Sequence, residues 1–175
     1  MTKSAKRILL IIVGIAALVI VSFVGFAASV FYSFDFADEY PHRSDAEMIQ
    51  TFHTHRAEFE EVRTMAMSDP VIQRVDENWT DPPNIAPDRV GKFRELFGII
   101  NTPRGISPNH STGELEIIAS SIGWVASGSS KGYLYAERKR SGTVVESLDD
   151  LSVLSSVGDR YLKPIERNWY LYFER

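Results

Sequence analysis

The stretch LEIIASSIGWVASGSSKGYLYAE (115–137) decides the fold class of this protein. Before it, apolar residues recur at steps of three and four, whereas from Leu115 onward they alternate with polar residues. A period of about 3.6 is typical of a helix that packs on one side, and a period of two is typical of a strand. The chain therefore predicts helices first and strands afterwards, which favours an α+β domain.

The sequence after residue 114 predicts an antiparallel sheet. The predicted strands are residues 115–120, 122–128, 132–137, 143–146, 161–165 and 168–174. Residues 129–131 and 139–142 are short enough for hairpin connections, which join antiparallel neighbours. Pro164 cannot donate a hydrogen bond to a neighbouring strand, so its strand is expected at an edge or with a bulge. We expect amphipathic helices packed on one face of this sheet.

The first helix of the soluble part is predicted to begin at Ser44. Glu47 completes a Ser-x-x-Glu capping box, in which each residue satisfies a backbone N–H of the other. An apolar stripe then continues to about Met67. Asp69 and Pro70 cannot continue this helix, but they can begin a second, short one.

A third helix is predicted to begin at Pro87, because proline suits the first helical position. Gly98 provides its C-terminal stop. The segments on either side, 76–87 and 99–113, are rich in Pro, Gly and Asn and lack periodicity, so we expect long loops there.

A second change of composition lies near the N-terminus, where residues 8–32 contain no charge. A helix of this length reaches about 38 Å, against roughly 30 Å for the hydrocarbon core of a bilayer. Three basic residues precede the run and three acidic residues follow it closely, and positive charge stays on the cytoplasmic side. The predicted regions are a cytoplasmic N-terminus (1–7), a transmembrane helix (8–32), a stalk (33–43) and an extracytoplasmic α+β domain (44–175), periplasmic in a bacterium.

A cleaved signal peptide is the competing interpretation of this segment. Gly25 and Ala27 place small residues where signal peptidase cuts. However, the apolar run exceeds the ~7–15 residues usual in such signals and continues beyond the cut. The length therefore favours an uncleaved anchor, and either interpretation places the domain across the membrane.

Charge and composition exclude several classes of function. Residues 33–175 hold all 23 Asp and Glu but only 16 of the 19 Lys and Arg, which gives this part a net charge of −7. We expect no nucleic-acid partner, because neutralising phosphates requires a concentrated positive surface. The chain has no cysteine, which excludes disulfides, thiolate metal sites and cysteine nucleophiles. It also lacks a cofactor fingerprint, so no cofactor is expected.

The sequence predicts no metal site. His53 and His55 would lie about 200° apart on a helix, and neither has the histidine partner four residues away that a zinc helix needs. Residues 76–81, DENWTD, offer oxygen atoms at alternating positions, as a calcium loop does. Asp81 and Pro87, however, stand where such a loop needs glycine and glutamate. A solvated loop with Trp79 packed onto the core is the expected structure.

One candidate for catalysis lies in the turn predicted near residues 127–131. Ser127 or Ser129 can approach Lys131, and a desolvated lysine can act as the base of a serine hydrolase. A Ser-x-x-Lys motif would require serine at position 128, which is Gly128, and no oxyanion motif accompanies it. The simpler interpretation is a flexible turn with Lys131 in solvent.

Two pairs of side chains are candidates for binding a ligand or a partner. Arg104 and His110 share the loop predicted over 99–113 and can form a small anion-binding surface. Tyr170 and Tyr172 share one face of the last strand. If helices cover only the opposite face, these tyrosines are exposed, and exposed tyrosines suit a protein interface.

Four segments carry a resemblance to a known group of proteins. They are HRAEFEEVRTM (55–65), DENWTDP (76–82), GWVASGSSKGYLY (123–135) and PIERNWYLYFER (164–175). The chain resembles short, uncharacterised bacterial proteins that are anchored to the membrane by a single helix. This resemblance covers most of the soluble part and implies a bacterial origin and the same topology. The group has no assigned activity, so it implies no catalytic residue.

The expected function is that of a non-catalytic interaction or accessory module of the cell envelope. Its partners would be the lipid bilayer, through residues 8–32, and another envelope protein. Two alternatives remain: a membrane-tethered serine–lysine hydrolase that uses the 127–131 turn, and a small-ligand receptor that uses the 99–113 loop.

Overall fold

The computed structural model describes residues 22, 42–123, 128–137, 141–149 and 158–175. The transmembrane helix predicted over 8–32 and most of the predicted stalk lie outside these ranges, apart from Ser22 and the last two stalk residues. Within the described ranges, no helix combines the length and apolar character that crossing a bilayer requires. Residues 42–175 form one unit.

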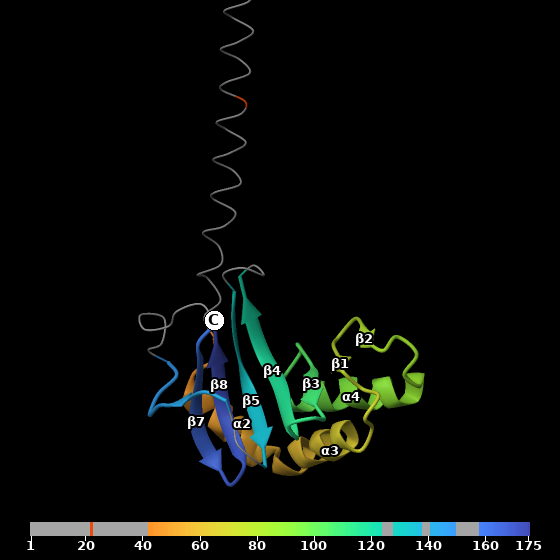
Figure 1. The fold of residues 1–175 in the computed structure, drawn as a ribbon, viewed down its shortest axis with the longest axis horizontal. Coiled ribbons are helices and arrows are strands. Elements are labelled where there is room, and N and C mark those ends of the chain that lie inside the picture. The colour runs from red at the N-terminus through yellow and green to blue at the C-terminus, as the bar shows by residue number, and fades with distance from the viewer. Residues whose placement is uncertain (1–21, 23–41, 124–127, 138–140, 150–157) are drawn as a thin grey trace, which may run out of the picture. The chain divides into compact units, whose positions relative to one another are not determined.

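The α+β prediction is confirmed for this unit: helices pack on one face of a mostly antiparallel sheet (Figure 1). The helices are α2 (Asp45–Thr54), α3 (Arg56–Met67) and α4 (Pro87–Ile100). The strands are β1 (Arg74–Val75), β2 (Thr80–Asp81), β3 (Ile106–Asn109), β4 (Glu114–Ile122), β5 (Ser129–Ala136), β6 (Thr143–Val144), β7 (Arg160–Glu166) and β8 (Trp169–Glu174). The strand order is β2-β1-β3-β4-β5-β8-β7-β6, and among the described strands only the β6–β7 pair is parallel.

The predicted capping box is present at the start of α2. The Ser44 hydroxyl accepts from the backbone N–H of Glu47 at 3.3 Å, and the Glu47 carboxylate accepts from the backbone N–H of Ser44 at 3.1 Å. The prediction of one continuous helix to Met67 is wrong, because the chain leaves helical geometry at His55 (φ −116°, ψ 35°). Phe52 before the break and Phe59 after it pack in the same core, with ring centroids 5.0 Å apart. The pattern of apolar residues therefore continues across the break and gives no sign of it in the sequence.

Helix α4 continues two residues beyond the predicted stop at Gly98. Ile100 is fully buried, and burial of that side chain favours the extra residues. Asn101 then ends the helix in the left-handed conformation (φ 53°), which asparagine tolerates better than most residues.

The sheet corrects one prediction that concerns the candidate site. Residues 129–131 do not form a hairpin turn, because they begin β5 and pair with the end of β4. Ser120, for example, lies opposite Lys131 in the register. The polar side chains of residues 129–131 suggested a turn, but the hydrogen bonds and ion pairs of Ser129 and Lys131 described below allow these residues to lie in a strand. The bulge expected around Pro164 is present, between Pro164 and Glu166.

Short strands lie in segments predicted as loops or helix. The 99–113 segment contains β3, the 76–87 segment contains β2, and β1 lies where a short second helix was expected. These strands are two to four residues long. Such lengths are too short for an alternating pattern to be recognised.

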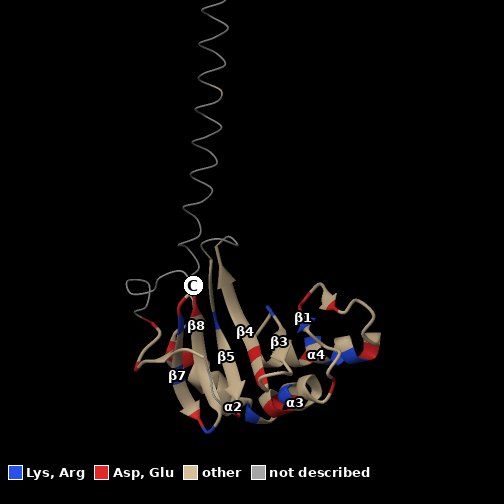
Figure 2. Cartoon of the chain, viewed as in Figure 1, with Lys and Arg blue, Asp and Glu red and all other residues tan. Residues whose placement is uncertain are grey.

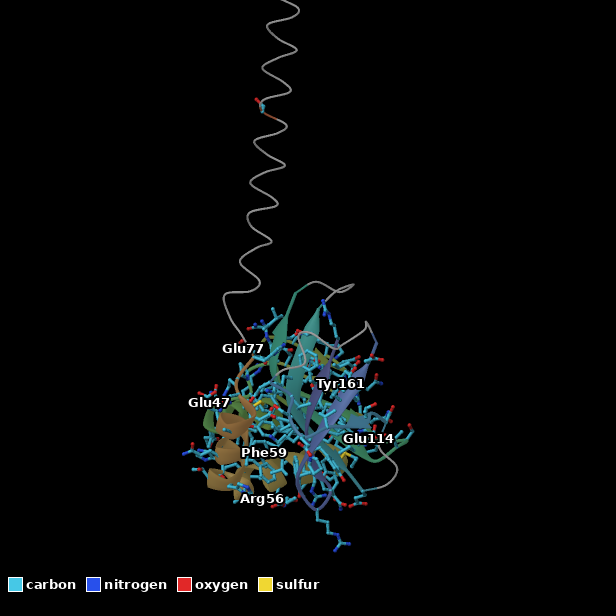
Figure 3. All side chains as sticks on the ribbon, turned by 90° about the vertical axis from the view of Figure 1, so that its left-hand side faces the viewer. Glu47, Arg56, Phe59, Glu77, Glu114 and Tyr161 are labelled. Atoms are coloured by element: carbon cyan, nitrogen blue, oxygen red, sulfur yellow. The ribbon has the colours of Figure 1, made fainter. Side chains whose placement is uncertain are left out.

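The main core lies between the helices and the sheet. Phe52 and Phe59 pack against Tyr133 of β5 and Trp169 of β8, with ring centroids 4.5–6.2 Å apart. In the edge-on view of Figure 3, the labels of Glu47 and Phe59 lie on the helix side of the domain, and that of Glu114 lies on the sheet side.

The other face of the sheet carries a smaller apolar cluster, and it contradicts one expectation. Tyr172 is 1% exposed rather than solvated, because its ring lies across Gly132 of the neighbouring strand. The Arg160 guanidinium lies 5.7 Å from the ring centroid. Tyr172 is therefore part of the fold, while Tyr170 on the same face is half-buried.

Gly132→Ala should destabilise the fold by about 2 kcal/mol or more, because the sheet is close-packed at this position. The added methyl would collide with the Ile117 carbonyl oxygen and approach the Tyr172 ring to 2.8 Å. The matched control is Gly98→Ala on α4, where nothing lies within 4 Å of the new methyl. We expect the control to be neutral or stabilising by up to ~1 kcal/mol in urea titrations. Equal stabilities for the two variants would contradict this description of the sheet.

Candidate functional site

Four charged side chains form an ion cluster between α2 and the sheet, which we call the buried ion cluster after its central pair, Lys131 and Asp45. The outer members, Asp149 and Lys163, have side chains that are 41% and 24% exposed. Lys131 is 1% exposed, and its Nζ lies 2.8 Å from Asp45 Oδ1 and 2.7 Å from Asp149 Oδ1. Lys131 and Asp45 are close enough to form an ion pair, but the geometry of their contact is not that of a hydrogen bond. Lys163 donates to the other Asp45 oxygen at 2.9 Å. The buried ion cluster thus connects α2, β5, β7 and the segment after β6.

Asp45 stays ionised at the centre of this cluster. Burial alone would raise the pKa of Asp45, but hydrogen bonds from the Leu148 backbone and Lys163, together with the charge of Lys131, outweigh it and lower that pKa. A lone buried carboxylate would be costly, and these donors offset the cost. Lys131 Nζ donates to Asp149 and is in ionic contact with Asp45, so it is directed at carboxylates and not at a serine hydroxyl.

His42 lies beside the buried ion cluster and bridges two serines. Its Nδ1 is 2.6 Å from Ser120 Oγ on β4, and its Nε2 is 2.8 Å from Ser129 Oγ on β5. The ring also packs edge-on against Phe173, with centroids 5.5 Å apart. Burial, followed by the charge of Lys131, lowers the pKa of His42 to about 4. The imidazole is therefore neutral at pH 7 and a weak base.

The predicted serine–lysine pair is not formed by the described residues. Ser129 and Lys131 both point toward the helices from β5, but Ser129 contacts His42 and Lys131 contacts carboxylates. Ser127 lies outside the described residues. No sequence signal could have identified His42 as the partner, because it lies 87 residues before Ser129 in a predicted stalk.

The structure does not bring Arg104 and His110 together. Arg104 precedes β3 and His110 follows it, so they lie at opposite ends of a strand whose four residues span about 13 Å of extended chain. Arg104 is exposed and its carbonyl accepts from Arg74 at 2.8 Å, whereas His110 Nε2 lies 2.9 Å from the Ile72 carbonyl. Each residue holds a different part of the β1–β3 region.

Trp79 is 53% exposed, which corrects the expectation that it packs onto the core. It ends a turn between β1 and β2, closed by a 2.9 Å hydrogen bond from the Asp76 N–H to the Trp79 carbonyl. The Arg74 guanidinium lies 5.8 Å from an indole ring centroid, and it donates to Asp76 at 3.1 Å. The turn between β1 and β2 that carries Trp79 lies at one edge of the sheet (Figure 1), and these contacts hold the indole beside it.

Two surface cavities lie near the C-terminal end of α4. A cavity of about 560 Å³ is lined by polar residues, namely Arg43, Glu47, Gln50, Thr51, Thr54, His55 and Asn101. A second cavity of about 300 Å³ is lined by Glu77, Arg94, Phe97, Gly98, Asn101 and Pro103. Neither cavity is lined by His42 or Ser129, so the serine–histidine contact does not face either of them.

No group of three or more His, Asp or Glu side chains among the described residues is arranged to hold a metal ion. Comparisons with protein families, with curated proteins and with solved structures found no match to this chain.

Lys131→Met should lower the free energy of unfolding by about 3 kcal/mol, because Asp45 would stay buried without its principal partner. Lys163→Met is the matched control, because Lys163 binds the same carboxylate but its side chain is 24% exposed. The control should cost about 1 kcal/mol or less in urea titrations, as expected for a partly solvated pair. A larger loss in the control than in Lys131→Met would contradict the central place of Lys131.

The pKa of His42 predicts a specific pH dependence of stability. Its value falls from 6.5 to about 4 on folding, so between these values the unfolded chain binds more protons. The free energy of unfolding should therefore decrease as the pH is lowered from about 6.5 to 4. In His42→Gln this decrease should be smaller by about 2 kcal/mol, measured by urea titration across that range. His53→Gln, the same substitution at an exposed histidine on α2, is the matched control for the change of residue type.

Proposed function

We propose that this chain is a single-pass membrane protein whose extracytoplasmic domain is a non-catalytic interaction module of the cell envelope. The anchor is supported by the charge-free run over 8–32, with basic residues before it and acidic residues after it. In this proposal the N-terminus is cytoplasmic and the α+β domain binds another envelope protein.

The exposed indole of Trp79 is the observation that carries the interaction role. Tryptophan is among the residues most enriched at the centres of protein interfaces, because it buries a large area with few rotatable bonds. Arg74 and the β1–β2 turn hold this indole in place, so little conformational entropy is lost when a partner covers it. A preorganised, half-exposed tryptophan therefore supports a binding surface.

The surroundings of Trp79 indicate the chemistry of its partner. Glu77 and Asp81 are exposed on either side of it along the chain, and neither forms an ion pair with a described residue. A complementary partner would present an apolar pocket for the indole with Lys or Arg at its rim.

The serine hydrolase is the second candidate, and the contact between Ser129 and His42 is the observation in its favour. The lowered pKa of His42 opposes this role, because a general base works best with a pKa near the operating pH. A fluorophosphonate probe tests it directly: labelling that disappears in Ser129→Ala would favour hydrolysis over the interaction role.

The interaction role is tested by photo-cross-linking in the native membrane. A benzoylphenylalanine placed at Asn78, beside the indole, should attach one recurrent protein that mass spectrometry identifies. Trp79→Ala should reduce this product at least tenfold, since loss of a central interface tryptophan commonly costs about 2 kcal/mol or more. Val144→Ala is the matched control, because Val144 is 48% exposed on the strand at the opposite edge of the sheet. Background labelling alone, or a product that does not depend on Trp79, would contradict the proposal.

A further inference from the structure

The 300 Å³ cavity beside α4 combines features of a small-molecule site. Arg94, Phe97, Gly98 and Asn101 are spaced at three and four residues, so they come from one side of α4 and its C-terminal cap. The remaining wall comes from the loops after β1 and after α4. Its volume lies at the lower end of the range typical of ligand pockets, which suits a small metabolite rather than a large cofactor.

Two opposite charges at this cavity lack ionic partners. The carboxylate of Glu77 accepts no hydrogen bond and forms no ion pair with a described residue. Arg94 uses only its Nε, which donates to the Asp76 carbonyl at 3.3 Å, and its two terminal nitrogens remain available. Other cations of α4 are paired, as Lys92 is with Glu61 and Glu95, among the mixed charges visible along α3 and α4 (Figure 2).

The remaining lining of the cavity is largely apolar. Phe97 is 3% exposed and its ring stacks on Phe93, with centroids 6.0 Å apart, so it offers the cavity only a small, fixed apolar edge. Pro103 adds a rigid apolar ring, and Gly98 leaves space where another residue would place a side chain. An apolar group of a ligand can therefore lie against α4 while its polar groups reach the two charges.

We propose that this cavity binds a free α-amino acid with an apolar side chain. The ligand carboxylate would bind the terminal nitrogens of Arg94, which suit a bidentate contact. The ligand ammonium would bind the Glu77 carboxylate, and the ligand side chain would lie against the exposed Pro103 ring and the small exposed edge of Phe97. A zwitterion with an apolar side chain satisfies all three features at once. This site shares Glu77 with the rim of the Trp79 interface, but its other residues lie on α4 and in the loop after it. Amino-acid binding is measured without a protein partner, so the failure of one proposal is distinguishable from the failure of the other.

The first experiment measures thermal stabilisation of the full-length protein in mild detergent by the twenty free amino acids. We expect a saturable shift with large apolar ones such as leucine or phenylalanine. Leucinamide, which lacks the carboxylate, and N-acetyl-leucine, which lacks the ammonium, should each bind at least tenfold more weakly. Arg94→Gln should weaken leucine binding at least tenfold without altering the response to leucinamide. Glu77→Gln should also weaken leucine binding at least tenfold, without altering the response to N-acetyl-leucine.

The second experiment fills the cavity. Gly98→Leu places a side chain where nothing lies within 4 Å of the new Cβ, and it should abolish the shift. Gly91→Leu is the matched control, because Gly91 lies on the same helix with equally open space but does not line the cavity. The control should bind leucine as the wild type does.

Three results would overturn the proposal: no saturable shift with any of the twenty amino acids, equal shifts for leucine and its two blocked analogues, or unchanged leucine binding in Gly98→Leu. The analogue series needs no substitution, so it decides the question even where a variant fails to fold.

Discussion

The domain depends on an ammonium group that has been removed from water. Lys131 stands on β5, near the middle of the sheet, and its charge is balanced by Asp45 at the start of α2 and by Asp149 after β6. The two members of a buried ion pair depend strongly on each other, because removing one of them leaves the charge of the other buried and uncompensated. The position of α2 on the sheet and the path of the chain after β6 are therefore fixed by the same group. The aromatic core supplies the apolar burial, while this cluster selects the arrangement in which that burial occurs.

The same cluster explains why the candidate catalytic group has a structural role. Ser129 and Lys131 are separated by one residue, a spacing at which two side chains share a face of a strand. On that face the lysine contacts carboxylates, and the serine contacts the His42 imidazole, whose pKa is lowered by burial and then by the charge of Lys131. Reactive side chains thus satisfy one another, and the groups free to contact other molecules lie elsewhere, at Trp79 and beside α4.

The sequence was sufficient for the features that depend on local periodicity and capping. The change of period near Leu115 predicted the α+β class, and the Ser44–Glu47 box marked the start of α2. The start of β5 could not be predicted, because Ser129 and Lys131 resemble turn residues unless their distant partners are known. The α4 cavity was equally inaccessible: Arg94 and Gly98 are neighbours on a helix, but only the tertiary fold brings Glu77 to them. Arg104 and His110 were grouped by a loop that contains a strand, and β3 separates them.

The distance along the chain between partners has a consequence for biosynthesis. Asp45 is synthesised early, yet Lys163, which binds it, follows 118 residues later, and Trp169, which packs on Phe52, follows later still. Helices α2 and α3 leave the ribosome well before the strands that cover their apolar sides. Until β8 is made, Phe52 and Phe59 lack their contact with Trp169, and this part of the core can close only after β8 has left the ribosome. The last strand therefore completes the folding of this domain.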